Sequence, residues 1–128
     1  MNEAVEKALQ EIRTAHPDNR VDAQDDGQGG AWVLVEDLSL GDLYDPNTSW
    51  VGFRITFQYP YADVYPHFVR SDLKRRDGRP LGDGITNGHT HQGRAALQLS
   101  RRSNRLNPKT DTALLKLLKV IQWLKTHP

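Results

Sequence analysis

Apolar side chains recur at helical spacing near both ends of the chain. Over residues 2–15 this spacing predicts an amphipathic helix, which ends at His16 and Pro17 and buries a stripe of Ala4, Val5, Ala8, Leu9 and Ile12. A second helix is predicted to open at residues 108–111, where Thr110 or Asp111 would cap backbone amides. Its expected buried stripe is Ala113, Leu114, Leu117, Leu118, Ile121 and Leu124. Its expected solvent side is Lys116, Lys119, Gln122 and Lys125.

Between these helices the pattern changes to the alternation of strands. The clearest strand is predicted over residues 50–59, with one apolar face made by Val51, Phe53, Ile55, Phe57 and Tyr59. Residues 31–35 form a second β run and residues 21–23 a weaker one, and the Asp- and Gly-rich segment 25–30 between them predicts a hairpin turn. Residues 67–69 resume extended character after Pro66.

The order of these elements predicts the fold class. Consecutive strands between terminal helices indicate an α+β fold, in which an antiparallel meander of about four strands packs one face against the helices, in a single domain over residues 1–128. Residues 71–107 are rich in glycine and polar side chains, which predicts a long irregular loop. Irregular segments of that length in a compact domain usually carry the function, so we expect the site there.

Composition narrows the classes of chemistry. The chain has 128 residues, 37% of them apolar, and no cysteine. The absence of cysteine excludes disulfides, thiolate zinc sites and a cysteine nucleophile in this chain. The first residues lack the basic-then-apolar order of a signal peptide, and no stretch approaches the roughly 20 apolar residues of a membrane span, so a cytoplasmic protein is expected.

Charge is distributed unevenly although the net charge is only +1. Residues 1–64 carry 4 Lys or Arg against 12 Asp or Glu, and residues 65–128 carry 13 against 4. Such polarity steers charged partners to one end of a molecule, while a near-neutral total argues against general coating of nucleic acid. Partner proteins are the expected use, with neither nucleic acid nor membrane involved.

Three short segments occur in a characteristic order. They are residues 59–69 (YPYADVYPHFV), residues 93–99 (GRAALQL) and residues 106–112 (LNPKTDT). In this order they resemble the Tyr-Pro and Pro-x-Val element, the Gly-x-Ile-Cys-Leu-Asp-Ile stretch and the Trp-Ser-Pro-x-x-Thr helix entry of ubiquitin-conjugating enzymes and their bacterial relatives. The resemblance covers most of the chain and implies the UBC-like fold, with an active-site loop before the last helix.

The resemblance also implies which residues would form the site. It puts Ala96 at the position of the nucleophilic cysteine and Asn87 near that of the asparagine that stabilises the oxyanion, although no proline precedes it. His89 or His91 would then act as base for an incoming amine. The chain ends after the second helix, as in compact bacterial members. Because alanine forms no thioester, the chain is either a natural non-catalytic variant or one in which a cysteine was replaced by alanine.

Three functions follow as expectations. The first is a bacterial transferase that accepts a ubiquitin-like modifier from a ubiquitin-activating-like enzyme and passes it to a target, inert here through Ala96. The resemblance implies a place for it in antiphage defence, with a deconjugating protease as a further partner and no cofactor. The second is a non-catalytic UBC-like interaction module. The third is a metal-dependent hydrolase in which His89 and His91, with a carboxylate such as Asp83, hold zinc.

A cluster of cations and hydroxyls follows the nucleophile position. Guanidinium groups suit carboxylates and phosphates, so we expect a partner-binding surface made by Arg101, Arg102, Asn104 and Arg105. The alternatives are a surface that neutralises the acidic first half and a site for phosphate or nucleic acid.

Overall fold

The computed structural model describes residues 1–127 as two helices packed on one antiparallel sheet. The helices are α1 (Glu3–Ala15) and α2 (Ala113–Thr126). The six-stranded sheet has the order β1-β2-β4-β5-β8-β7, made by β1 (Val21–Asp25), β2 (Ala31–Ser39), β4 (Thr48–Ile55), β5 (His67–Arg70), β8 (Arg94–Leu99) and β7 (Ile85–His91). A two-stranded ribbon pairs β3 (Tyr44–Asp45) with β6 (Lys74–Arg75). The predicted α+β class, with a helix at each end, is confirmed.

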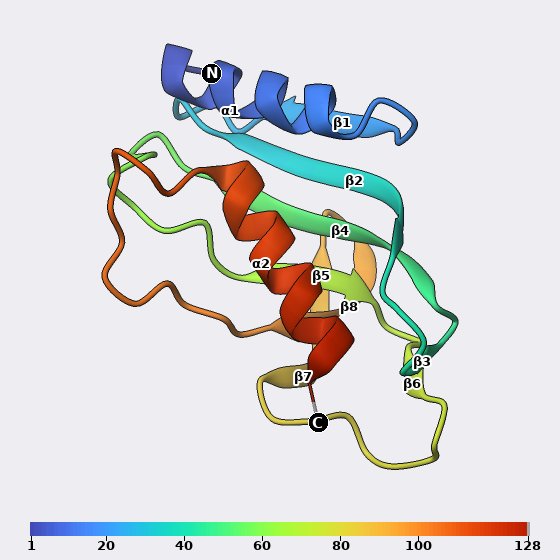
Figure 1. Cartoon of the computed structure of the whole chain (residues 1–128). Coiled ribbons are helices and arrows are strands. Elements are labelled where there is room, and N and C mark those ends of the chain that lie inside the picture. Colours follow the sequence, from blue (N-terminus) through green and yellow to red (C-terminus); the bar gives the residue numbers. More distant parts are fainter. Residues whose placement is uncertain (128) are drawn as a thin grey trace.

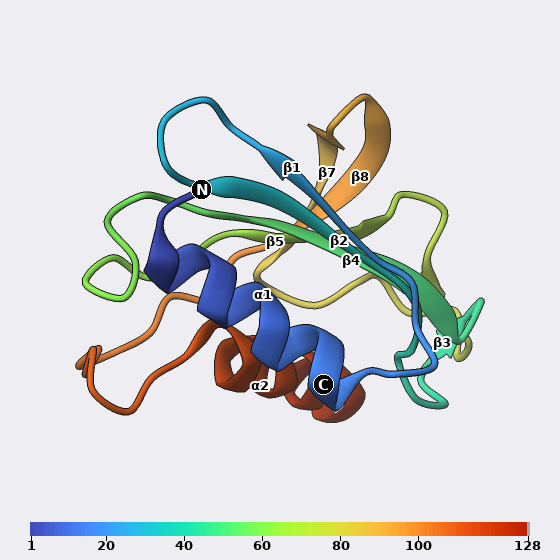
Figure 2. The ribbon, with the colours of Figure 1, turned by 90° about the horizontal axis from the view of Figure 1, so that it is seen from above.

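Both helices cover the same face of the sheet, which we call the inner face (Figures 1 and 2). Alternate residues of the strands point to this face, so Val33, Val51, Phe53 and Leu99 are fully buried beneath the helices. Helix α1 contributes the stripe predicted for it, except that Ala4 is only half-buried. Asn2 caps α1 by accepting a hydrogen bond from the Val5 amide at 3.0 Å. None of the helices within residues 1–127 is both long and apolar enough to cross a membrane.

Two details of helix α2 correct the sequence prediction. The cap is Thr112, whose hydroxyl accepts from the Leu115 amide at 3.1 Å, rather than Thr110 or Asp111. The buried stripe includes Lys116, predicted to face solvent, while Leu118, predicted to be buried, is 44% exposed. The buried face is rotated because Lys116 forms an ion pair with Asp63, which makes its burial favourable. The spacing of apolar residues in the sequence does not reveal this contact.

The clearest predicted strand is shorter than its alternation suggests. Strand β4 ends at Ile55, and the chain then turns, with the Tyr59 amide donating to the Thr56 carbonyl at 3.0 Å. Phe57, predicted to lie on the apolar face, is 56% exposed as a result. Residues 56–66 form instead a loop that leads to β5.

The predicted irregular region of residues 71–107 is wrong for its central part. Strands β7 and β8 form a hairpin there and extend the predicted meander from about four strands to a sheet of six, because Leu97 and Leu99 point to the inner face and β8 pairs with β5. The left-handed backbone of Gly93 (φ 82°) allows the tight turn of this hairpin. Few apolar residues in β7 mark it as a strand, so the alternation signal is missing.

His67 lies fully buried on the inner face, between Phe53 of β4 and Leu99 of β8. Its ring stands 5.0 Å from the Phe53 ring, and neither ring nitrogen has a hydrogen-bond partner within residues 1–127. Burial, reinforced by the nearby charge of Lys116, lowers the pKa of His67 to about 3. The folded protein therefore holds this imidazole neutral.

We expect His67 to make the fold sensitive to acid. Between about pH 6.5 and pH 3 the unfolded chain binds a proton at this histidine and the folded chain does not, so the free energy of unfolding falls as the pH drops through that window. From pH 7.5 to pH 5.0 the loss from this group is about 2 kcal/mol. Urea unfolding at both pH values should show a correspondingly smaller loss in His67→Leu. Equal losses in the two proteins would contradict the assignment.

Candidate functional site

The β7–β8 hairpin crosses the outer face of the sheet, opposite the helices. Figure 2 shows the hairpin on one side of the sheet and both helices on the other. At its tip, Gln92 Nε2 donates to Gln24 Oε1 of β1 at 2.8 Å. The next residues are held by an ion pair of 3.2 Å between Arg94 and Glu36 of β2. The last two strands of the sheet therefore reach back to its first two.

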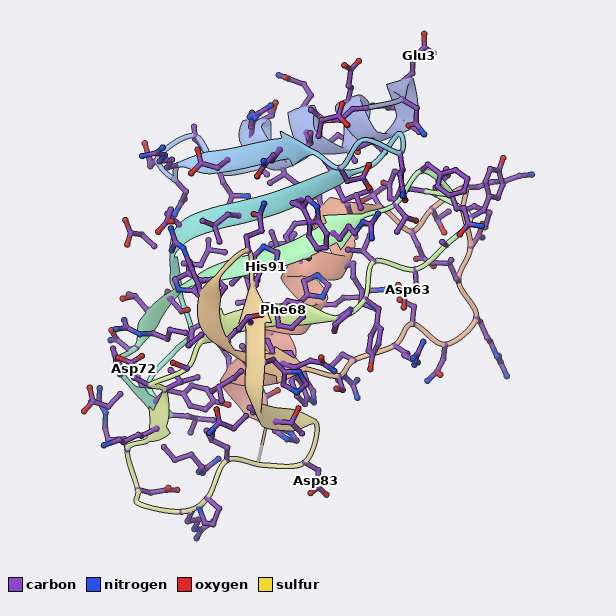
Figure 3. The ribbon with its side chains drawn as sticks, turned by 180° about the vertical axis from the view of Figure 1, so that it is seen from behind. Glu3, Asp63, Phe68, Asp72, Asp83 and His91 are labelled. Carbon is purple, nitrogen blue, oxygen red and sulfur yellow. The ribbon has the colours of Figure 1, made fainter. Side chains whose placement is uncertain are left out.

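His91 fixes this hairpin to the outer face (Figure 3). Its ring lies against Gly52 of β4, where a side chain would overlap with it. Three aromatic rings surround it, with centroids 6.0 Å (Trp32), 6.1 Å (Trp50) and 5.4 Å (Phe68) from its own. The side chain is thus enclosed on the outer face much as a core residue is enclosed on the inner face.

The surroundings of His91 hold it neutral. The residue is 2% exposed, and neither ring nitrogen meets the geometry of a hydrogen bond within the described part of the chain. Burial lowers the pKa of His91 and outweighs the opposing effect of the Val33 backbone, while the neighbouring charge of Arg94 makes a smaller contribution in the same direction as burial. An enclosed imidazole of this kind has no path to an incoming amine while the hairpin is in place.

Ala96 lies in strand β8 and not in an active-site loop. Its cross-strand neighbours are Arg70 of β5 and His89 of β7, and its side chain is on the outer face. The residue is only 1% exposed, because the hairpin curls over that face. The expectation of an irregular loop around this position is therefore wrong, and the position itself is closed to solvent.

Of the other predicted catalytic residues, only His89 lies next to Ala96. Asn87 falls in the register shift between Thr86 and His89 and has no partner on β8. Its exposed side chain accepts a hydrogen bond from the Gly88 amide at 2.8 Å. The ring of His89 is 3.1 Å from the Thr86 hydroxyl, so it is oriented by its own strand.

The residues predicted to bind zinc are not brought together as a set of ligands. His91 is enclosed by aromatic rings, and the backbone carbonyl of Asp83 lies 2.7 Å from His127 Nε2, in a different part of the molecule. Within residues 1–127 no group of three or more His, Asp or Glu side chains is placed to hold a metal ion.

The predicted arginine surface is formed by the segment between β8 and α2. Arg101 Cζ lies over the Trp123 ring, 5.2 Å from its centroid, and Arg102 Cζ lies over the Tyr65 ring, 4.1 Å from its centroid. Both line a hollow of about 180 Å³ together with Asn104. The structure therefore brings together three of the four predicted partner-binding residues, while Arg105 is exposed outside this hollow.

The segment is held by a part-buried cluster that we call the Asp63 cluster, made by Asp63, Ser103 and Lys116. Asp63 accepts from the Ser103 amide at 2.7 Å, from its hydroxyl at 2.8 Å and from Lys116 Nζ at 2.9 and 3.0 Å. Lys116 Nζ also donates to the Ser103 hydroxyl at 2.7 Å. Figure 3 shows Asp63 in the loop before β5, beside the segment that leads to α2.

The ionised form of Asp63 is favoured by these contacts. Burial opposes ionisation, but the hydrogen bonds from Ser103 and Lys116 outweigh it and hold the pKa of this carboxyl below its usual value. Sequence reasoning missed the cluster, since its members lie 40 and 53 residues apart and no motif connects them. The aromatic rings that enclose His91 were not predicted either, although a glycine inside a strand, here Gly52, signals that another group approaches the backbone closely.

Comparison of the chain with protein-family models, with curated proteins and with solved structures finds no match.

We expect Gly52→Ala to destabilise the protein through a clash with His91. Alanine suits a strand better than glycine does, but its methyl group would overlap with the imidazole, and overpacking of this kind costs about 1–3 kcal/mol. The His91→Ala variant supplies the matched background, because it removes the ring. Urea unfolding should show the Gly52→Ala loss in the parent and little or none with His91→Ala; the same loss in both would contradict the proposed contact.

Proposed function

We propose that this chain is a non-catalytic, ubiquitin-conjugating-enzyme-like interaction module that binds a ubiquitin-like modifier without forming a thioester. The order of helix, antiparallel meander and helix supports the proposal, since the resemblance implies that order, although the β7–β8 hairpin stands where it implies an active-site loop. The observation that carries it is Ala96, which offers no nucleophile and is 1% exposed on a paired strand. A ubiquitin-activating-like enzyme, a deconjugating protease and a place in antiphage defence stay predictions of the resemblance.

The binding surface in this proposal is residues 101–105, between β8 and α2, which we call the arginine segment. Arg101, Arg102 and Arg105 are exposed, and none of them forms an ion pair or donates a hydrogen bond within residues 1–127. Their donors are therefore available to carboxylates of a partner protein. Asn104 adds a neutral amide that suits the backbone of an extended peptide.

A transferase remains the second candidate because of one contact. His89 is the cross-strand neighbour of Ala96, so a cysteine in place of the alanine would have an imidazole beside it, which is one of the groups that activate a thiol. For that chemistry the hairpin would have to leave the outer face, since His91 and the aromatic rings enclose the site.

We expect Ala96→Cys to form no reducible adduct with a ubiquitin-like modifier when an activating enzyme and ATP are supplied. The burial of position 96 keeps the thiol from the activated carboxyl group. The assay is non-reducing electrophoresis, with a competent conjugating enzyme as positive control for the other components. A reducible adduct on the variant would reject the module and support the transferase.

Charge reversal in the arginine segment should weaken binding of the modifier. Arg101→Glu with Arg102→Glu removes two free guanidinium groups and adds two repulsive charges, so the affinity measured by titration calorimetry should fall by roughly tenfold or more. Lys74→Glu with Arg79→Glu is the matched control, because it makes the same charge change at exposed residues elsewhere, in strand β6 and in the turn that follows it. An equal loss of affinity in both double variants would mean that net charge alone causes the effect, and it would contradict the assignment of the binding surface to the arginine segment.

A further inference from the structure

The arginines of this chain divide into those with partners and those without. Ion pairs to carboxylates engage six of them, namely Arg20, Arg54, Arg70, Arg75, Arg79 and Arg94. Arg13 and Arg76 donate to backbone carbonyls. Within residues 1–127, the arginines that do neither are Arg101, Arg102 and Arg105, which all lie in one five-residue segment.

Two of these free arginines are held in place by aromatic rings. Arg101 lies over Trp123 of α2, and Arg102 lies over Tyr65 of the loop before β5. A cation–π contact holds a guanidinium group over a ring without using a carboxylate or carbonyl acceptor, so the N–H donors of both arginines stay available. The two side chains are therefore positioned to donate to a ligand.

The backbone between these supports is fixed as well. Ser103 follows both arginines in the chain, and its amide and hydroxyl donate hydrogen bonds to Asp63. Lys116 of α2 donates to the same hydroxyl. The hollow of about 180 Å³ thus has a rigid base at Ser103 and free donors on Arg101, Arg102 and Asn104. Such preorganisation lowers the ordering cost of binding.

The charges around the hollow do not balance. Its cations are Arg101, Arg102, Lys116 and Lys119, whereas Asp111 is its one carboxylate. Asp63 neutralises Lys116 from the side. Four cations against two carboxylates leave two positive charges, which repel each other until an anion enters.

We propose that this hollow binds a phosphate monoester. A phosphate monoester carries a charge of about −1.5 to −2 at pH 7 and three acceptor oxygens, which match the two excess charges and the free donors of the arginines and the asparagine. This inference goes beyond the proposed function, because phosphate binding requires no ubiquitin-like partner. It assigns the chain a second ligand class at the same surface, so an occupied hollow would compete with acidic groups of a protein partner.

Titration calorimetry with inorganic phosphate, sulfate and acetate tests the proposal on the whole chain. Phosphate and sulfate should bind, and acetate, with a single charge, should bind at least about tenfold more weakly. Arg101→Gln with Arg102→Gln should abolish the phosphate signal, and circular dichroism should show that this surface variant folds. Arg105→Gln is the matched control, because it removes a free charge from the same segment outside the hollow.

Each result decides the proposal in one direction. Phosphate binding that is lost in the double variant and kept in Arg105→Gln supports it. Acetate binding as tight as phosphate binding, absence of phosphate binding, or an equal loss in the control would overturn it. Phosphoserine and adenosine monophosphate, titrated as separate arms, carry the same group. Tighter binding of either than of inorganic phosphate, lost with the same two arginines, would support the proposal and identify the source of the phosphate.

Discussion

The part-buried ion pair between Asp63 and Lys116 is the contact on which the segment between β8 and α2 depends. It lets a lysine occupy a core position of α2, and through Ser103 it ties the loop before β5 to the segment that follows β8. Removing one partner of this pair would leave the other charge part-buried and without its counter-ion, which destabilises the fold. The arginines next to Ser103 owe their fixed backbone to this pair, and the hollow owes its base to it.

The sheet is covered on both faces by different means. Helices cover the inner face, while the chain's own β7–β8 hairpin covers the outer face through His91, Gly52 and the surrounding aromatic rings. As a consequence, position 96 is enclosed and the exposed cations after β8 are the part of the neighbourhood that a partner can reach. The division between a closed strand and an open cationic segment is why we propose binding and not transfer.

How much of this was predictable differs from element to element. Helical spacing located α1 and most of α2, and alternation located β4. A run of β-branched and aromatic residues located β2, and the extended residues after Pro66 located β5. The β7–β8 hairpin was missed because β7 carries mostly polar residues. Its buried histidine, His91, packs on the outer face of the sheet, away from the helices. Lys116 was placed on the wrong side of α2 because only its contact with Asp63, distant in sequence, makes its burial favourable.

For the site, the sequence was enough to predict the arginine segment, because its cations are neighbours along the chain. Three of its four predicted residues share a hollow, yet the rings and the carboxylate that organise them come from distant elements. The resemblance to conjugating enzymes pointed to Ala96, but no local pattern indicated that its side chain is covered.

The most direct test of the account is the accessibility of position 96. Because the chain has no cysteine, Ala96→Cys carries a single thiol, whose reaction with an aromatic disulfide reagent reports its exposure, and the exposed neighbour Ala95→Cys supplies the reference rate. The thiol at position 96 should react roughly a hundredfold more slowly than that at position 95, and the difference should disappear in urea. Equal rates in the folded proteins would contradict this prediction, because position 96 would then be open for transfer chemistry.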